Sequence, residues 1–313
     1  MNDFAMKIIT DINEYIQEPC AATIGSFDGV HLGHRSILDE LREAASADGL
    51  PIMVLTFARH PRLVFGCDAG PFLLSSREGK IALLESLGVD ILVMLDLDTY
   101  MASMSAERFM REVLLERLGV CILAVGYDHH FGKPCITEGI REYILYGKKL
   151  GIDVFRASPF AINGKKVSSS EVRQTLLDGD VETAALLLGR RYSISGKVVR
   201  CAGIGHTLGF PTANIAPSCD MLIMPKNGVY EVDAIVAGKT YKGVMNIGVK
   251  PTVNSDKMRS AEVHIIDFSG DIYGKSISVS FVRRLRDEAH FDSLESLRAQ
   301  IELDVEKVKN KMI

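Results

Sequence analysis

The chain has 313 residues, of which 47% are hydrophobic and 24% charged, a composition typical of a globular protein with room for two domains. Its net charge of −4 excludes a general electrostatic attraction to nucleic acid. Apolar runs stay below the roughly 18 residues that cross a membrane, and the first residues lack a signal-peptide pattern. The six cysteines form no Cys-x-x-Cys pair, which favours free thiols. We therefore expect a cytoplasmic protein with neither nucleic-acid nor membrane partners.

Up to about residue 186, short apolar runs alternate with helical patterns. The runs predict strands at 21–24, 52–57, 91–95, 122–125 and 152–155. Helices are predicted at 38–45, 80–87, 106–118, 140–150, 170–177 and 181–188. Because the runs are apolar without alternation, we expect strands that are buried on both faces. The β-α-β-α order predicts an α/β domain with a parallel sheet covered by helices.

A glycine-rich segment joins the first predicted strand to its helix and reads Gly25-Ser26-Phe27-Asp28-Gly29-Val30-His31-Leu32-Gly33-His34. Glycines let a backbone approach a nucleotide, and the free N–H groups of a helix start attract phosphate. His31 and His34 are expected on one face of that helix start, where two imidazoles add donors. Two other interpretations stay open: a helix cap with two surface histidines, and half of a zinc site, for which no further ligands stand at metal spacing.

Two later segments also fit a bound nucleotide. Asp128 follows the fourth predicted strand, and ligands of open parallel sheets bind beyond the carboxyl ends of strands. It is placed to meet a ribose or base, or it forms an Asx turn. Ser168, Ser169 and Ser170 stand at a helix start, where serines cap free N–H groups or donate to phosphate. Arg173 lies one turn further on as a charge partner for such a phosphate.

These segments, in this order, resemble the adenylyltransferase half of the prokaryotic bifunctional FAD synthetases. The family patterns are Gly-x-Phe-Asp-Gly-x-His-x-Gly-His, Val-Gly-x-Asp-Phe-x-Phe-Gly and Ile-Ser-Ser-Thr-x-Ile-Arg, and the stretch 56–61 resembles Thr-Phe-x-Pro-His-Pro. Arg59, His129 and Ser170 depart from these patterns, and His130 takes a position that is often arginine. The resemblance implies that the catalytic residues His31 and His34 stabilise a transferring phosphate. It also implies ATP binding by Gly25, Phe27, Asp28, Gly29, His31, His34, Asp128, Ser168, Ser169, Ser170 and Arg173.

From about residue 192 the pattern changes to β-rich stretches with frequent glycine. Strands are predicted at 193–200, 228–237, 240–247, 261–268 and 276–285, and an amphipathic helix at 294–309. Ala237-Gly238-Lys239 is typical of a hairpin turn. The series predicts an antiparallel barrel or sandwich. We place the domain boundary so that the first domain spans 1–186 and the second 187–313.

The strongest motif of the second half runs from Gly203 to Asn214. It is not a Rossmann fingerprint, because the third glycine position is Leu208 and Pro-Thr follows in place of a helix. The stretch 270–276 is not a P-loop, since only three residues separate its glycines. A glycine loop followed by Thr212 and Asn214 offers oxygen ligands to Mg²⁺ and phosphate, or forms a β-turn with a polar edge.

The same segment resembles the riboflavin kinase signature Gly-x-Gly-x-x-Leu-Gly-x-Pro-Thr-Ala-Asn, and the stretches 225–230, 246–252, 262–268, 273–275 and 283–288 follow in family order. The resemblance implies a small antiparallel β-barrel with a C-terminal helix. Glu262 would be catalytic and accept a hydroxyl proton, although an ordinary exposed carboxylate is the other interpretation. Further implied roles are ATP binding by Gly203, Gly205, Gly209, Pro211, Thr212 and Asn214, Mg²⁺ binding by Thr212 and Asn214, and flavin binding by Phe281, Arg286 and Glu288.

The resemblance covers residues 20–305 and implies two successive reactions. ATP would phosphorylate riboflavin to FMN, and a second ATP would adenylylate FMN to FAD with release of pyrophosphate. Three alternatives stay open. His129 and His130 suggest a kinase whose first domain binds nucleotide without turnover. A nucleotidyltransferase for another substrate leaves the second half unexplained, and a flavin-binding sensor is disfavoured by Thr212, Asn214 and Glu262. An oligomer is possible, and no sequence feature sets its size.

Overall fold

The computed structural model describes residues 5–64, 70–96, 101, 103–127, 138–200, 209–250 and 258–310. The chain divides into two compact units, Met1–Gly70 with Arg77–Ser168, and Pro71–Ser76 with Ser169–Ile313. The short segment Pro71–Ser76 joins the second unit through a parallel bridge between Leu73 and Leu222. The two units divide directly before helix α7 (Ser169–Asp178). The domain boundary predicted from the sequence, between residues 186 and 187, stays a proposal.

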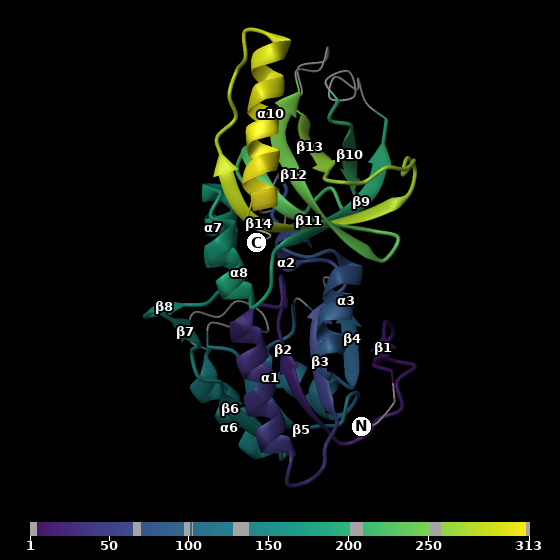
Figure 1. Cartoon of the computed structure of the whole chain (residues 1–313). Helices are drawn as coiled ribbons and strands as arrows, with labels where there is room; N and C mark the ends of the chain where they lie inside the picture. The colour runs from purple at the N-terminus through teal and green to yellow at the C-terminus, as the bar shows by residue number, and fades with distance from the viewer. Residues whose placement is uncertain are drawn as a thin grey trace. The chain divides into compact units, whose positions relative to one another are not determined.

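The first unit is built on a six-stranded parallel sheet in the order β1-β4-β3-β2-β5-β6 (Figure 1). Its strands are β1 (Lys7–Ile9), β2 (Cys20–Ile24), β3 (Ile52–Phe57), β4 (Ile91–Leu95), β5 (Val120–Val125) and β6 (Asp153–Arg156). The five predicted strands are confirmed, and β2 and β4 are buried along their whole length, as expected of strands covered on both faces. The edge strand β1 is not predicted from the sequence, because its three residues are too few to show a period.

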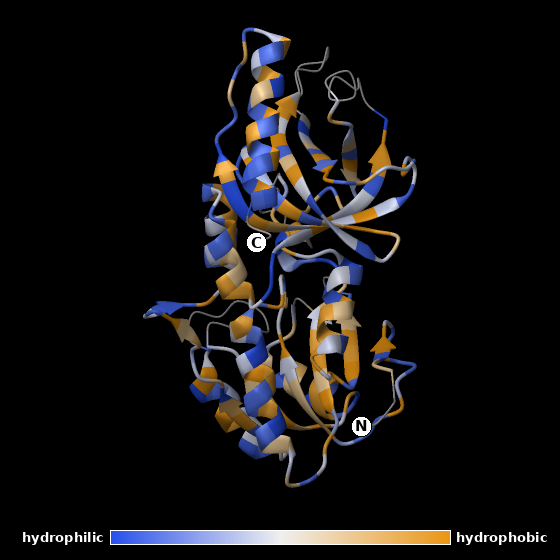
Figure 2. Ribbon diagram, viewed as in Figure 1, coloured by the Kyte–Doolittle hydropathy of each residue, from blue (hydrophilic) through white to orange (hydrophobic). Residues whose placement is uncertain are grey.

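Helices cover both faces of this sheet. Leu38 of α1 (Leu32–Ala45) and Leu84 of α3 (Arg77–Ser86) pack on the face that carries Ala21. On the opposite face, Phe109 of α5 (Ala106–Phe109) packs in one cluster with Ala22. This cluster also takes in the π-helical segment η1 (Met110–Leu115) and α6 (Ile140–Leu150). Figure 2 shows the result as apolar strands flanked by helices with one polar side.

Three short elements of the first unit are absent from the sequence prediction. They are α2 (Pro61–Val64), β7 (Ala161–Ile162) and β8 (Lys165–Lys166). The predicted helix at 106–118 is also different in kind, because it starts as an α-helix and continues as a π-helix over Met110–Leu115. Elements of two to four residues carry no measurable period, and the hydrogen-bond pattern of a helix cannot be read from apolar spacing.

The second unit contains a closed antiparallel barrel in the order β10-β13-β12-β11-β14-β9 (Figure 1). Its strands are β9 (Ser193–Val199), β10 (Thr212–Pro217), β11 (Gly228–Val236), β12 (Lys239–Lys250), β13 (Met258–Ile265) and β14 (Ser276–Arg286). Five of these are predicted from the sequence, while β10 occupies the stretch expected to be a polar loop or turn. The helices α7, α8 (Val181–Leu188) and α10 (Leu294–Lys309) belong to this unit.

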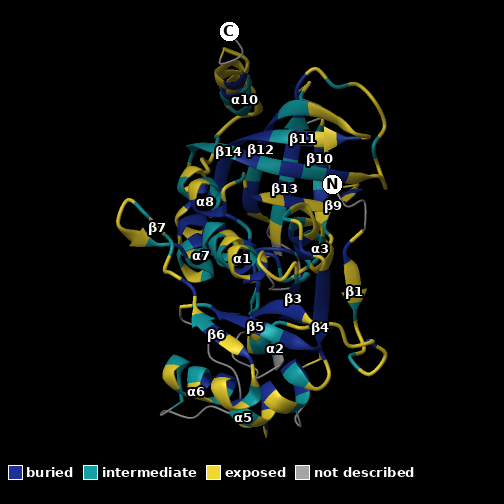
Figure 3. Cartoon of the chain, turned by 90° about the horizontal axis from the view of Figure 1, so that it is seen from below, coloured by how far each residue is buried: buried dark blue, intermediate teal, exposed yellow. Residues whose placement is uncertain are grey.

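The barrel interior and its hairpin follow from local sequence. Residues of β9 alternate strictly between exposed and buried, so that Ile194 and Val198 face the core. Figure 3 shows the buried positions in dark blue along the sheet and the barrel. Ala237 and Gly238 both have positive φ, 48° and 78°, in a two-residue loop between β11 and β12. This geometry is that of a type I′ turn, and it confirms the predicted hairpin.

Candidate active sites

Two histidines cap helix α1 reciprocally. The Nδ1 of His31 accepts a hydrogen bond from the backbone N–H of His34 at 3.3 Å, and the Nδ1 of His34 accepts one from the N–H of His31 at 3.3 Å. The two rings stack with their centroids 3.7 Å apart. A ring nitrogen that accepts an N–H carries no proton, so the neutral rings hold their protons on Nε2. The structure thus confirms a helix cap, but His31 is buried and not a surface histidine.

The loop before these histidines has an unusual backbone. Phe27, Gly29 and Val30 have positive φ of 47°, 79° and 39°. Two of these three residues are not glycine, and such conformations persist only where the surroundings over-determine them. A side chain at position 33 would meet the His31 ring at 3.1 Å, which explains why a glycine stands between the histidines. The conformation of this loop therefore depends on the contacts that surround it.

A pocket of about 230 Å³ lies at the ends of β2 and β5 and at the start of α1. Five residues predicted for nucleotide binding line it: Gly25, Phe27, His31, His34 and Ser168. This position beyond the carboxyl ends of parallel strands is the one expected for a ligand of such a sheet. The paired histidines and the helix start give the pocket several N–H donors, which suits a phosphate. Among the described residues, no group of histidine, cysteine and carboxylate side chains could hold a metal ion.

The remaining predicted residues of this half lie elsewhere. Asp28 is 1% exposed and is not part of the pocket wall, and Gly29 is buried beside it. Ser169, Ser170 and Arg173 belong to α7 in the second unit. There the guanidinium Nε of Arg173 donates to the carbonyl of Phe72 at 2.7 Å. Asp128 lies outside the described residues, as do His129 and His130.

Sequence reasoning did not find two residues that line this pocket. The Tyr127 ring contacts two cations: its centroid lies 3.8 Å from the guanidinium carbon of Arg156 and 4.5 Å from the ammonium nitrogen of Lys166. Desolvation lowers the pKa of Lys166. Tyr127 could have been noticed as an aromatic residue in the glycine-containing stretch after the fourth predicted strand. Its cationic partners come from distant parts of the chain, so the sequence does not show the cluster. This cluster adds positive charge to the rim of the pocket.

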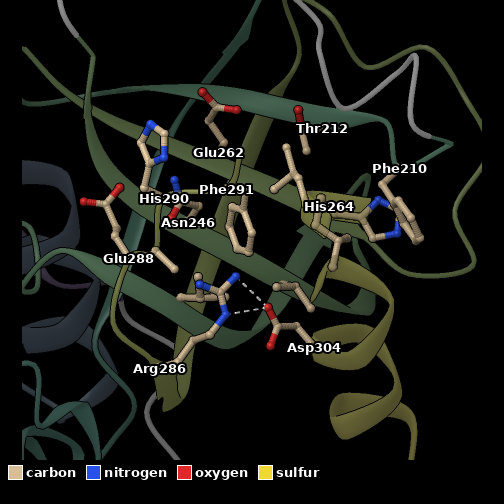
Figure 4. A pocket seen from close by; sticks show the side chains of 15 residues that line it. Phe210, Thr212, Asn246, Glu262, His264, Arg286, Glu288, His290, Phe291 and Asp304 are labelled. Carbon is tan, nitrogen blue, oxygen red and sulfur yellow. Dashed lines mark hydrogen bonds and ion pairs between the residues drawn. The ribbon is translucent and has the colours of Figure 1, made fainter. Parts of the chain in front are cut away.

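In the barrel, strand pairing brings the predicted kinase residues together (Figure 4). Thr212 on β10 is paired with His264 on β13, and Asn214 is paired with Glu262. Glu262 is in turn paired with Asn246 on β12. Directly paired residues project from the same face of a sheet, so Asn214, Glu262 and Asn246 form one row across three strands. The alternate residues Ala213 and Val263 are buried in the barrel.

Two pockets lie near this row: Asn246 and Glu262 line the first, and Asn214 lines neither. The first, of about 420 Å³, lies between the barrel and α10, and its walls include Thr212, Asn246, Glu262 and Arg286 (Figure 4). The second, of about 400 Å³, is lined by Pro211, Thr212 and Ala213 with Val263 and the stretch 268–273. Thr212 lines both. Gly209, with φ of 84°, precedes this strand, while Gly203 and Gly205 lie outside the described residues.

Arg286 and Glu288 line the first pocket, and both have partners in the structure. The guanidinium Nε and Nη2 of Arg286 each lie 2.8 Å from Oδ2 of Asp304, a residue of α10 that is 1% exposed. Oε2 of Glu288 accepts a hydrogen bond from Asn227 at 3.0 Å. The other oxygen of Glu288 lies where a side chain at position 248 would stand, so Gly248 makes room for it.

Phe281, which is predicted to bind flavin, packs in the barrel core. It is fully buried in the barrel, with its ring centroid 5.3 Å from that of Tyr230 and 6.1 Å from that of Tyr192. It lines neither of the two pockets around Thr212. Flavin binding by Phe281 therefore stays a prediction. Asn246, His264 and Asp304, which the sequence did not single out, contribute to the first pocket instead.

Comparison with known proteins assigns a different family model to each half of the chain. The family model of riboflavin kinase matches residues 188–312, and that of FAD synthetase matches residues 13–171. Neither match includes the stretch 172–187, which contains most of α7 and α8. The two models thus correspond to the barrel and to the parallel sheet.

Whole-length relatives carry both names. A bifunctional riboflavin kinase/FMN adenylyltransferase of Escherichia coli K12 is 38% identical over 96% of both chains, and one of Pseudomonas fluorescens is 40% identical over 91% of both. A crystal structure described as a macrolide-efflux protein of Streptococcus pneumoniae superposes with a TM-score of 0.88 at 29% identity, covering 98% of this chain and 99% of that one. None of the described helices is long and apolar enough to span a membrane. The chain belongs to the family of bifunctional riboflavin kinases/FMN adenylyltransferases.

Proposed function

We propose that this chain makes FAD from riboflavin in two steps. The barrel transfers the γ-phosphoryl group of ATP to the 5′-hydroxyl of riboflavin, and the parallel-sheet unit transfers AMP from a second ATP to the FMN phosphate. Family membership supports both activities. The observation that carries the kinase assignment is the strand pairing that places Glu262 beside Asn214 and at the wall of the pocket between the barrel and α10, because phosphoryl transfer depends on positioned polar groups.

In the kinase reaction, riboflavin binds in the pocket between the barrel and α10, and ATP binds in the neighbouring pocket. Glu262 lines the first pocket and accepts the proton of the 5′-hydroxyl as its oxygen bonds to the γ-phosphorus. ADP leaves with the electron pair of the broken bond. Arg286 and Glu288 line the same pocket and orient the flavin, and Phe291 adds an aromatic wall beside them. Pro211 and Thr212 line the pocket that we assign to ATP, and an ATP contact by Gly209 is part of the proposal.

The row of oxygen-bearing side chains also fits Mg²⁺. Thr212 supplies a hydroxyl, Asn214 an amide oxygen and Glu262 a carboxylate on neighbouring positions of β10 and β13. Mg²⁺ prefers oxygen ligands and is held by one or two side chains together with substrate phosphates. We propose Thr212 and Asn214 as its protein ligands. Bound there, the ion would neutralise charge on the phosphates of ATP.

In the adenylyl transfer, a phosphate oxygen of FMN attacks the α-phosphorus of ATP and pyrophosphate leaves. His31 and His34 line the pocket at the start of α1, and their Nε2–H groups stabilise the charge that grows on the α-phosphate. Gly25, Phe27 and Ser168 line the same pocket. Nucleotide contacts by Asp28, Gly29, Asp128, Ser169, Ser170 and Arg173 are part of the proposal.

The negative net charge supports small-molecule substrates without nucleic acid. Three cysteines of the described chain, Cys20, Cys121 and Cys219, are free thiols. Free thiols are typical of a reducing compartment, so we propose a cytoplasmic location.

A product analysis tests the two activities. Purified protein is incubated with riboflavin, excess ATP and Mg²⁺, and the flavins are separated by chromatography over time. We expect FMN first and FAD later. FMN alone would remove the adenylyl transfer from the proposal, and no conversion would refute it altogether.

Two substitutions assign the activities to residues. Glu262→Gln keeps the size of the side chain but removes the proton acceptor, so we expect FMN formation to fall by about 10²-fold. His31→Ala should abolish conversion of supplied FMN to FAD and leave FMN formation unchanged. Unchanged FMN formation in the first variant, or loss of both activities in the second, would refute these roles.

A further inference from the structure

A buried lysine lies beneath the phosphate-binding loop of the first unit. Lys80 belongs to α3 and is only 8% exposed, which is rare for a lysine. Its ammonium Nζ donates to the carbonyl of Ser26 at 2.9 Å and lies 3.3 Å from Oγ1 of Thr56. The Thr56 hydroxyl donates to the same carbonyl at 3.1 Å. Two donors from separate elements thus converge on one backbone oxygen of the loop.

That oxygen precedes the strained part of the loop. Phe27 and Val30, at φ of 47° and 39°, each occupy a left-handed region that is unfavourable for a non-glycine residue. Such a conformation persists only when the surrounding contacts hold it. The hydrogen bonds to the Ser26 carbonyl are such contacts, because Ser26 directly precedes Phe27, the first residue with left-handed backbone. His31 follows directly after the second one, and it caps α1.

A neutral donor could bind the Ser26 carbonyl with a smaller desolvation penalty than a buried ammonium group. Burial disfavours the charged ammonium and lowers the pKa of Lys80, while the nearby charge of Asp28 acts in the opposite direction. Asp28 is itself 1% exposed, so the loop encloses a carboxylate next to the ammonium. Lys80 does not line the pocket, whereas Ser26 does. The lysine therefore acts on a ligand only through the loop that it supports.

We infer that Lys80 is a positioning residue for adenylyl transfer: its hydrogen bond to the Ser26 carbonyl holds the loop 26–30 so that His31 and His34 face the transferring phosphate. The inference rests on the proposed function of the first unit. It gives Thr56, the first residue of the Thr-Phe-x-Pro-His-Pro-like stretch, a defined place as the second donor to the same carbonyl. The kinase barrel takes no part in this arrangement.

The test compares Lys80→Met with a matched control. Lys148 is an exposed lysine on α6 of the same unit, so Lys148→Met makes the same chemical change where no loop depends on it. Steady-state rates are measured for FMN plus ATP giving FAD, and separately for riboflavin plus ATP giving FMN. We expect Lys80→Met to lower kcat for FAD formation by about 10- to 100-fold, as a displacement of about 1 Å in a site does. FMN formation should change less than twofold, and Lys148→Met should match the unchanged protein in both.

Two further variants separate positioning from folding. Lys80→Gln keeps a neutral donor and Lys80→Arg keeps the charge, and we expect each to recover part of the kcat lost in Lys80→Met. Circular-dichroism melting gives the folded fraction, and rates are compared per folded molecule. If Lys80→Met does not fold, Lys80→Gln takes its place in the comparison, with kcat expected at least threefold below that of the unchanged protein.

The outcomes are distinct. The rate of FAD formation per folded molecule is compared between Lys80→Met, or the Lys80→Gln that replaces it, and the control Lys148→Met. If the two rates agree within twofold, the role of Lys80 is overturned. No FAD formation by the unchanged protein overturns the proposed adenylyl transfer itself, whatever the variants do.

Discussion

The ion pair between Arg286 and Asp304 offers a quantitative test of how α10 shapes the proposed flavin pocket. The carboxylate of Asp304 is 1% exposed and the side chain of Arg286 is 20% exposed, with two nitrogens of the guanidinium 2.8 Å from one oxygen. The second oxygen of Asp304 accepts a hydrogen bond from Gln300 at 3.1 Å. Asp304→Ala therefore leaves a guanidinium without its acidic partner at the wall of a pocket.

The expected cost follows from this burial. Removing one partner of a buried ion pair costs about 3–5 kcal/mol. Arg286 retains some solvent and a hydrogen bond from Nη1 to the carbonyl of Asp287 at 3.0 Å, so we take the lower end, about 3 kcal/mol. For a unit of about 150 residues this corresponds to a fall of roughly 6–12 °C in Tm. Because Arg286 loses its orientation, the KM for riboflavin should rise about tenfold.

The assay combines scanning calorimetry with the two rate measurements. Glu302→Ala is the matched control, because Glu302 pairs with Arg298 on the same helix at 3.0 Å and both side chains are about half exposed or more, at 61% for Arg298 and 49% for Glu302. That exposed pair should contribute about 0.5 kcal/mol or less. FMN adenylylation should be unchanged in both variants. Equal Tm and equal riboflavin KM in Asp304→Ala and Glu302→Ala would refute the reasoning.

Three further predictions concern other parts of the chain. Gly248→Ala places a methyl group on the Glu288 carboxylate and should lower riboflavin phosphorylation about tenfold while FMN adenylylation is retained; equal loss of both would point to misfolding. Burial raises the pKa of the Cys20 thiol to about 12, so at pH 8 it stays protonated and iodoacetamide should label Cys121 and Cys219 before Cys20, as mass spectrometry can show. Ala237→Asn should stabilise the type I′ turn by about 0.5–1 kcal/mol in urea unfolding, and a lower stability would contradict the turn geometry.

Much of the fold follows from local sequence. The apolar runs of the first unit are long enough to show burial on both faces, and they locate five of its strands. The glycine-rich segment before α1 and the stretch around Thr212 stand out because their composition fits a backbone that approaches a phosphate. These features depend on neighbouring residues alone, which explains why they are visible in the sequence.

The tertiary structure decided which of these residues meet. Strand β10 escaped prediction because Thr212 and Asn214 form a strand only through pairing with β13 and β9. The same pairing places Asn214 next to Glu262, which lies 48 positions further along the chain. Phe281 became a core residue because its strand turns that position into the barrel.

The supporting residues are the least accessible to sequence reasoning. Lys80 reaches a carbonyl 54 residues away in the chain, and Asp304 reaches a guanidinium from a helix that follows the barrel. The sequence by itself determined the two kinds of domain and the loops that we propose to face phosphate, because turn chemistry and hydrophobic period act over a few residues. Only the tertiary structure decided which buried charges hold those loops and pockets in place, because burial and pairing depend on residues that are distant in the chain.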